Sequence, residues 1–143
     1  MGDLPKQQTD EATVLDMEAS IEHLSRGTVR NVDVLLVVTE PYYRSLATTG
    51  RIVPLAHELG LQRVWVVANK LRSDDDAAAI REYCAGRGFE IIAEVPFDES
   101  ITEADRLGQA LMDYAPSAPA VAAVTHLADV LMERLGATVP ARS

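Results

Sequence analysis

The 143-residue sequence has little cysteine, few aromatic residues and a shortage of basic residues. Its single cysteine, Cys84, can form no disulfide within the chain, and no Cys-His cluster accompanies it at metal-ligand spacing. No stretch approaches the roughly 18 to 20 apolar residues of a membrane span, and the first residues lack the apolar core of a signal peptide. We therefore expect a cytoplasmic protein with no membrane span and no metal site of its own.

The charge balance points away from nucleic acid. Lys and Arg number 13 against 22 Asp and Glu, which gives a formal net charge of −9. A chain with this charge, and with its basic residues scattered, would be repelled by a phosphate backbone. Nucleic acid is therefore not an expected partner.

What is present fits one globular domain, with 48% hydrophobic and 24% charged residues. Residues 1–11 are polar and without periodicity, so we expect a disordered leader there, a single domain over 12–136 and a frayed tail over 137–143. Apolar, β-branched runs predict strands at 12–15, 32–38, 63–68 and 90–95.

Stretches with helical features separate or follow these runs. We expect helices over 43–59, from 74 to Gly86 and Gly88, over 99–114 and over 119–135. Strands joined by helices of this length predict βαβ units, and hence an α/β fold with a mostly parallel sheet and helices on both faces.

In open parallel sheets, ligands bind beyond the carboxyl ends of the strands. Asp16 follows the first run, and its carboxylate could hold Mg²⁺ near a nucleotide or simply cap the following helix. Asn69 follows the third run, and its carboxamide could recognise an adenine edge or lie in an ordinary turn. The other strand ends are Thr39-Glu40-Pro41 and Pro96-Phe97-Asp98.

An ordered set of motifs adds to these separate signals. The segment LDMEASIEHLSRGT at 15–28 is followed by TEP at 39–41, VVANK at 66–70 and VPFD at 95–98. Together they resemble the switch II region, and the sequence that follows it, of MinD/ParA-type P-loop ATPases. The resemblance is greatest to the CooC-type nickel-insertion ATPases of carbon monoxide dehydrogenase maturation, and it covers about residues 13–135.

The resemblance implies a P-loop NTPase-like three-layer sandwich that dimerises around ATP and Mg²⁺ and serves a metalloenzyme client. Asp16 resembles the switch II aspartate in the magnesium shell. Asn69 resembles the adenine-reading asparagine, with Lys70 beside it, and Pro96, Phe97 and Asp98 resemble the loop that flanks the base.

Two family features have no counterpart in these residues. The sequence contains no G-x-x-x-x-G-K-[ST] motif to cradle phosphates. The family's paired metal-binding cysteines also have no counterpart, since Cys84 stands alone inside a predicted helix. Without the P-loop strand, the sheet would be left with an unpaired edge. Either the Asp16 strand closes onto 32–38, or a second chain fills the gap, through self-association or from a P-loop-containing partner.

Three functions remain open from the sequence. The first is a truncated or split CooC-like nucleotide-binding protein that cannot hydrolyse ATP alone. The second is a non-catalytic dimerisation or regulatory module for a full-length ATPase. The third is a phospho-receiver domain, since Asp16, Thr39 and Lys70 close three successive runs.

Overall fold

The structure is a computed structural model that describes residues 24–30 and 32–136. The predicted leader, the predicted strand at 12–15 and the predicted tail lie outside these residues. The described strands are β1 (Leu35–Thr39), β2 (Val64–Leu71) and β3 (Glu90–Pro96). The described helices are α1 (Arg26–Arg30), α2 (Tyr43–Glu58), α3 (Asp74–Arg87), α4 (Glu99–Arg106), α5 (Leu111–Tyr114) and α6 (Pro119–Leu135).

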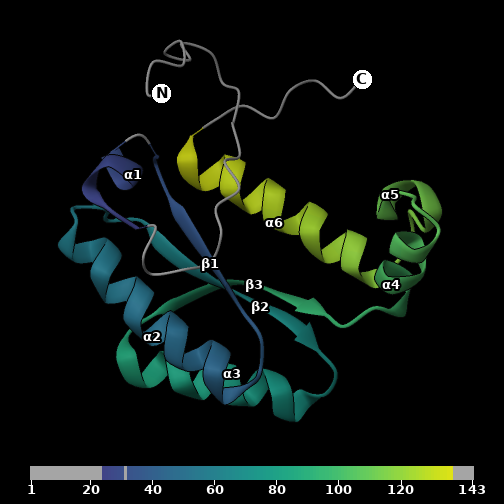
Figure 1. Cartoon of the computed structure of the whole chain (residues 1–143), viewed down its shortest axis with the longest axis horizontal. Coiled ribbons are helices and arrows are strands. Elements are labelled where there is room, and N and C mark those ends of the chain that lie inside the picture. The colour runs from purple at the N-terminus through teal and green to yellow at the C-terminus, as the bar shows by residue number, and fades with distance from the viewer. Residues whose placement is uncertain (1–23, 31, 137–143) are drawn as a thin grey trace.

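The three strands form one parallel sheet in the order β1-β2-β3, with α2 and α3 on one face and α6 on the other (Figure 1). Val66 and Ile80, both 0% exposed, belong to the core between the sheet, α2 and α3. Val67, Val95 and Ala120 belong to a smaller core between the sheet and α6. Helices on both faces confirm the predicted three-layer α/β architecture.

The α3 helix shows how local sequence sets the element boundaries. Ser73 caps its start by accepting a hydrogen bond from the Asp76 backbone N–H at 3.2 Å, and three aspartates fill the first turn. Their negative charge is favourable beside the exposed N–H groups of a helix start. The predicted helix beginning at 74 is confirmed, as are those over 43–59 and 119–135 to within a residue.

The prediction of one helix over 99–114 was wrong. The α4 helix ends at Arg106, and Gly108 then takes a left-handed φ of 70°. The Gln109 N–H bonds back to the Ala104 carbonyl at 2.8 Å, which closes the end of α4 before α5 begins. A glycine can adopt this backbone conformation without a steric penalty, so the helix stops there.

The strand pairing carries two irregularities between β2 and β3. The second lies near the carboxyl ends, where Ala68 pairs with Glu94 and Leu71 pairs with Pro96. From the first pair to the second, β2 advances three residues and β3 advances two. The extra residue makes Asn69 and Lys70 part of a β-bulge. Such bulges re-aim side chains locally, and this one lies at the edge where a ligand is expected.

Strand β1 lies at one edge of the described sheet and is less completely covered than β2. Among the described residues, β1 has a strand neighbour on one side only, which is β2. Leu36 packs in the core beneath α6, and Val38, which shares its face by strand alternation, is 55% exposed. The described part of the molecule therefore presents an apolar side chain next to an unpaired strand edge.

None of the helices in the described residues is long and apolar enough to cross a membrane.

Candidate functional site

The carboxyl ends of the three strands bring most of the predicted residues to one edge of the sheet. Thr39 pairs with Ala68, directly before Asn69, and Leu71 pairs with Pro96. The ends of β1, β2 and β3 are thus neighbours, as the parallel fold predicts. Asp16, the predicted magnesium-shell residue, lies outside the described residues.

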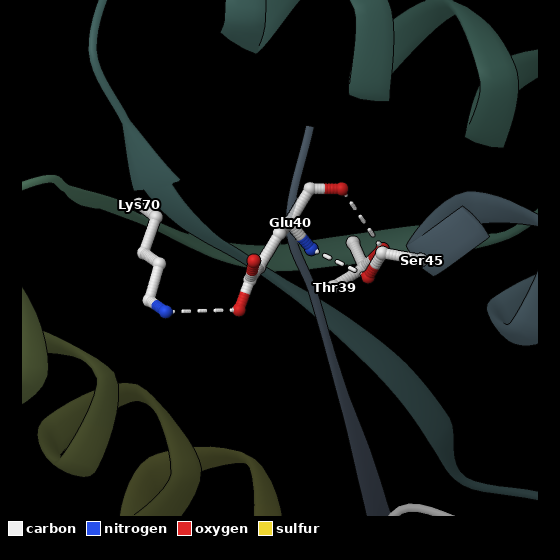
Figure 2. A network of polar contacts seen from close by, with 4 residues as sticks. All are labelled: Thr39, Glu40, Ser45 and Lys70. Carbon is white, nitrogen blue, oxygen red and sulfur yellow. Dashed lines mark hydrogen bonds and ion pairs between the residues drawn. The ribbon is translucent and has the colours of Figure 1, made fainter. Parts of the chain in front are cut away.

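At the end of β1, a small hydrogen-bond network fixes the backbone (Figure 2). The Thr39 side chain is fully buried, and its hydroxyl lies 3.0 Å from the Ser45 hydroxyl at the start of α2. Ser45 Oγ in turn accepts a hydrogen bond from the Glu40 backbone N–H at 2.8 Å. These contacts tie the last residues of β1 to the first turn of α2, so Glu40 has a defined position.

The Glu40 carboxylate reaches across to the neighbouring strand (Figure 2). Its Oε2 lies 3.1 Å from the Lys70 Nζ, and the two side chains are 35% and 51% exposed. Lys70 is the one non-glycine residue of the described chain with a positive φ, at 59°. This left-handed conformation costs an L-residue about 1–2 kcal/mol because Cβ approaches the backbone carbonyl. A strained backbone at a strand end is the kind of outlier that accompanies functional sites.

Asn69 precedes this strained residue and is half-buried. Strand β2 runs through Asn69 to Leu71, so the alternative of an ordinary turn at Asn69-Lys70 was wrong. Within the described residues, the carboxamide of Asn69 makes no hydrogen bond. As far as the described residues go, its donor and its acceptor are therefore both unengaged.

The loop after β3 is held by Asp98, whose carboxylate accepts hydrogen bonds from two helix starts. Asp98 Oδ1 accepts from the Ser100 N–H of α4 at 2.9 Å, and Oδ2 accepts from the Ala120 N–H of α6 at 3.2 Å. These backbone hydrogen bonds, that of Ser100 foremost, lower the pKa of Asp98 because they stabilise the charged carboxylate. Both oxygens are occupied by the chain itself, so Asp98 shapes the loop.

Phe97 is also fixed in place at this edge. Its backbone N–H donates to the Leu71 carbonyl at 2.8 Å, which continues the link between β3 and β2. The Arg72 guanidinium lies 3.9 Å from the centre of the Phe97 ring, a distance typical of a cation–π contact. The half-buried Pro96 and Phe97 thus form an apolar wall beside the strand ends.

The sequence did not single out the roles of Glu40, Ser45 and Arg72. Glu40 was noted only as part of a strand end, because no local pattern shows that its carboxylate would face Lys70 from the neighbouring strand. In a parallel sheet both strand ends lie at the same edge, and this expectation could have placed Glu40 near Lys70. Two surface hollows of the described residues lie elsewhere, one lined by Glu103, Arg106 and Leu107 and the other by Arg26, Val29, Arg30, Val32, Leu59, Gly60 and Leu61.

The fold is that of MinD/ParA-type ATPases. A ParA family ATPase from Chlorobium tepidum superposes with a TM-score of 0.64 at 26% identity, over 76% of this chain and 46% of that one. The cell division ATPase MinD of Pyrococcus furiosus gives 0.58 at 27% identity, over 72% and 43%. No family model matches the chain.

Sequence comparison identifies the more specific relationship. The chain is 39% identical over 128 residues to the carbon monoxide dehydrogenase accessory protein CooC of Rhodospirillum rubrum, which is 90% of this chain and 47% of that protein. An ATP-binding protein of Methanocaldococcus jannaschii, itself uncharacterised, is 39% identical over 100 residues, covering 70% and 39%. The chain is therefore homologous to CooC, as its motifs predicted, and spans about half the length of the curated relatives it matches or less.

Proposed function

We propose that this chain forms the base-binding part of a CooC-like nucleotide-binding protein related to the nickel-insertion ATPases. The observation that carries the proposal is the carboxamide of Asn69, which makes no hydrogen bond to the described residues and lies at the shared strand-end edge, in a chain 39% identical to CooC. The relatives and solved structures described above are ATPases, ATP-binding proteins and a dehydrogenase accessory protein, and none is a receiver domain.

The chemistry of the edge suits an adenine base. A carboxamide offers a donor and an acceptor side by side, which matches the paired amino group and ring nitrogen on an adenine edge. Pro96 and Phe97 would flank the ring, and Asp98 would hold their loop through its two backbone hydrogen bonds. Lys70, whose ammonium pairs with Glu40, would lie beside the nucleotide. Asn69, Lys70 and the 96–98 loop together thus form the proposed subsite.

The phosphate side of the nucleotide needs residues that this sequence does not offer. Asp16 would hold Mg²⁺ through its carboxylate, as the resemblance implies, but the 143 residues contain no glycine loop with a lysine. A bound Mg²⁺ would neutralise charge on the phosphates. We therefore propose that these 143 residues bind MgATP weakly and do not hydrolyse it unaided. The phosphate cradle would come from further residues of the same polypeptide or from another chain.

Calorimetry tests this proposal on the 143-residue chain. Titration with MgATP should give either no measurable heat or a dissociation constant well above the micromolar range, and a phosphate-release assay should show no turnover. Micromolar affinity or measurable turnover by the purified chain would contradict it. An Asn69→Ala variant provides the control for any weak heat that is detected.

A second function is favoured by the uncovered side of β1. Among the described residues, the edge of β1 has no strand partner and Val38 is exposed, which would suit a chain that docks beside β1 and supports a dimerisation or regulatory module. We propose a P-loop-containing ATPase as the partner, with self-association as the competing case. Co-expression with a full-length MinD/ParA-type ATPase should yield a complex on size-exclusion chromatography. Recovery of this chain alone, monomeric or in inclusion bodies, would argue against it.

A further inference from the structure

The left-handed backbone at Lys70 raises the question of what maintains it. The residue lies in the β-bulge between Ala68 and Leu71, and it carries a Cβ that disfavours its φ of 59°. A glycine would adopt the same conformation freely. The contacts of the Lys70 side chain can help to maintain this conformation.

The Lys70 side chain is linked to the hydrogen-bond network at the end of β1. Its ammonium pairs with Glu40 at 3.1 Å, and Glu40 is itself fixed, because its backbone N–H donates to Ser45 at 2.8 Å. Ser45 is held by the buried Thr39 at 3.0 Å. A continuous chain of contacts therefore runs from the buried end of β1, through Glu40, to the bulge in β2 (Figure 2).

We propose that Glu40 is a positioning residue for Asn69, and that it acts through Lys70. Together with the strand pairing around the bulge, the ion pair favours the left-handed conformation of residue 70, and this conformation sets the direction in which the adjacent carboxamide points. The role in base recognition rests on the proposed function of Asn69. The effect of Glu40 on the conformation of Asn69 and Lys70 is independent of that proposed function.

If the Glu40–Lys70 pair only stabilised the fold, its removal should affect the protein no more than the removal of another half-exposed ion pair. Ion pairs between half-exposed side chains contribute little to stability, so a surface pair alone does not explain a strained lysine. The chain provides a matched comparison in Glu90 and Arg134, whose side chains pair at 2.6 Å and are 49% and 40% exposed. Glu90 begins β3, at the opposite end of the sheet from Glu40.

The test compares Glu40→Gln with the control Glu90→Gln by NMR of the 143-residue chain. The first readout needs no nucleotide: the backbone and carboxamide resonances of Asn69, and the ¹³C shifts of Lys70, which report a positive φ. Glu40→Gln should move these resonances, and Glu90→Gln should leave them in place. The swapped double variant Glu40→Lys/Lys70→Glu should return them toward the wild-type positions.

The second readout is the preference for MgATP over MgGTP, taken from shift titrations that can follow weak binding. Loss of a base hydrogen bond should lower the ratio of the two affinities about ten-fold in Glu40→Gln, which corresponds to 1.4 kcal/mol. Glu90→Gln should keep the wild-type ratio. If the wild-type chain binds neither nucleotide at Asn69, the proposed function fails, and the resonances alone decide whether Glu40 sets the conformation.

Two results would overturn the proposal. One is a Glu40→Gln variant whose Asn69 and Lys70 resonances match the wild type. The other is a variant in which the resonances move while the ATP preference at Asn69 stays unchanged, because the carboxamide would then not depend on Glu40 for base recognition.

Discussion

Asp98 and Ala120 are 22 residues apart in sequence, yet the Asp98 carboxylate accepts a hydrogen bond from the Ala120 backbone N–H at 3.2 Å. The same carboxylate caps α4 through Ser100 at 2.9 Å. One side chain therefore satisfies N–H groups at the starts of two helices and ties α6 to the loop after β3. This explains how the 96–98 loop keeps its shape although its residues are only half-buried.

Asp98 should make stability depend on pH in the acid range. Its pKa is lowered in the folded state, chiefly by the Ser100 backbone hydrogen bond, so it stabilises the fold above the ordinary aspartate pKa. That contribution is lost as the pH falls through the lowered value. Asp98→Asn should reduce Tm clearly at pH 7 and by less at an acid pH, where the pH has fallen through the lowered pKa of Asp98. Thermal melts followed by circular dichroism would measure this.

The control for Asp98 is Glu99→Gln, which changes an exposed acid in the first turn of α4. It should change Tm only slightly. An Asp98→Asn variant that loses the same number of degrees at both pH values would show that the charged carboxylate is not what the two helix starts need.

Lys70 should reveal its backbone strain in denaturant unfolding. Lys70→Ala removes the ion pair but keeps a Cβ at a φ of 59°, whereas Lys70→Gly removes both. The glycine variant should therefore be more stable than the alanine variant by about 1 kcal/mol. Equal free energies of unfolding, or a more stable alanine variant, would mean that the bulge relaxes when the side chain is shortened.

Gly50 allows α2 and α3 to approach each other closely. A Cβ built at Gly50 would collide with the Tyr83 hydroxyl, while the next atom of that ring would lie at an ordinary 3.4 Å. Gly50→Ala should therefore destabilise the protein by about 1–2 kcal/mol. In a Tyr83→Phe background the same change should become neutral or stabilising, since alanine favours a helix over glycine by about 1 kcal/mol.

Urea unfolding of the four proteins in this cycle would measure the coupling between Gly50 and Tyr83. A Gly50→Ala penalty that persists in the Tyr83→Phe background would place the cause in the backbone of α2 and not in the hydroxyl.

Cys84 should resist thiol reagents until the protein unfolds. It is 1% exposed in the core beneath α3, and burial raises the pKa of its thiol because the thiolate is poorly solvated there. Labelling with a chromogenic disulfide should be slow in buffer and fast in denaturant. Rapid labelling of the folded chain would contradict the described packing of α3 on the sheet.

The sequence predicted the fold better than it predicted the side-chain contacts. Apolar strand patterns and helix-start residues such as Ser73 and Asp74 act locally, so the strands within 32–96 and the helices over 43–59, from 74 and over 119–135 were found within a few residues. The split between α4 and α5 was missed because an isolated Gly108 does not by itself end a helical pattern.

The finer features of the candidate site depend on tertiary structure. The bulge at Asn69-Lys70 arises from the pairing of β2 with β3, and the Glu40–Lys70 ion pair arises from two neighbouring strand ends. Neither is visible as a spacing in the sequence. The place of Asp98 beside a base stays a prediction, whereas its role as a cap of two helices depends on the position of α6, which the sequence does not show.

An NMR titration of the ¹⁵N-labelled chain with MgATP, up to millimolar nucleotide, would show whether the strand-end edge at Asn69 binds the base. The largest shifts should occur at Asn69, Lys70, Phe97 and Asp98, and Asn69→Ala should abolish them. No shift at millimolar MgATP, or shifts centred on the distant hollow at Arg26 and Arg30, would contradict this expectation.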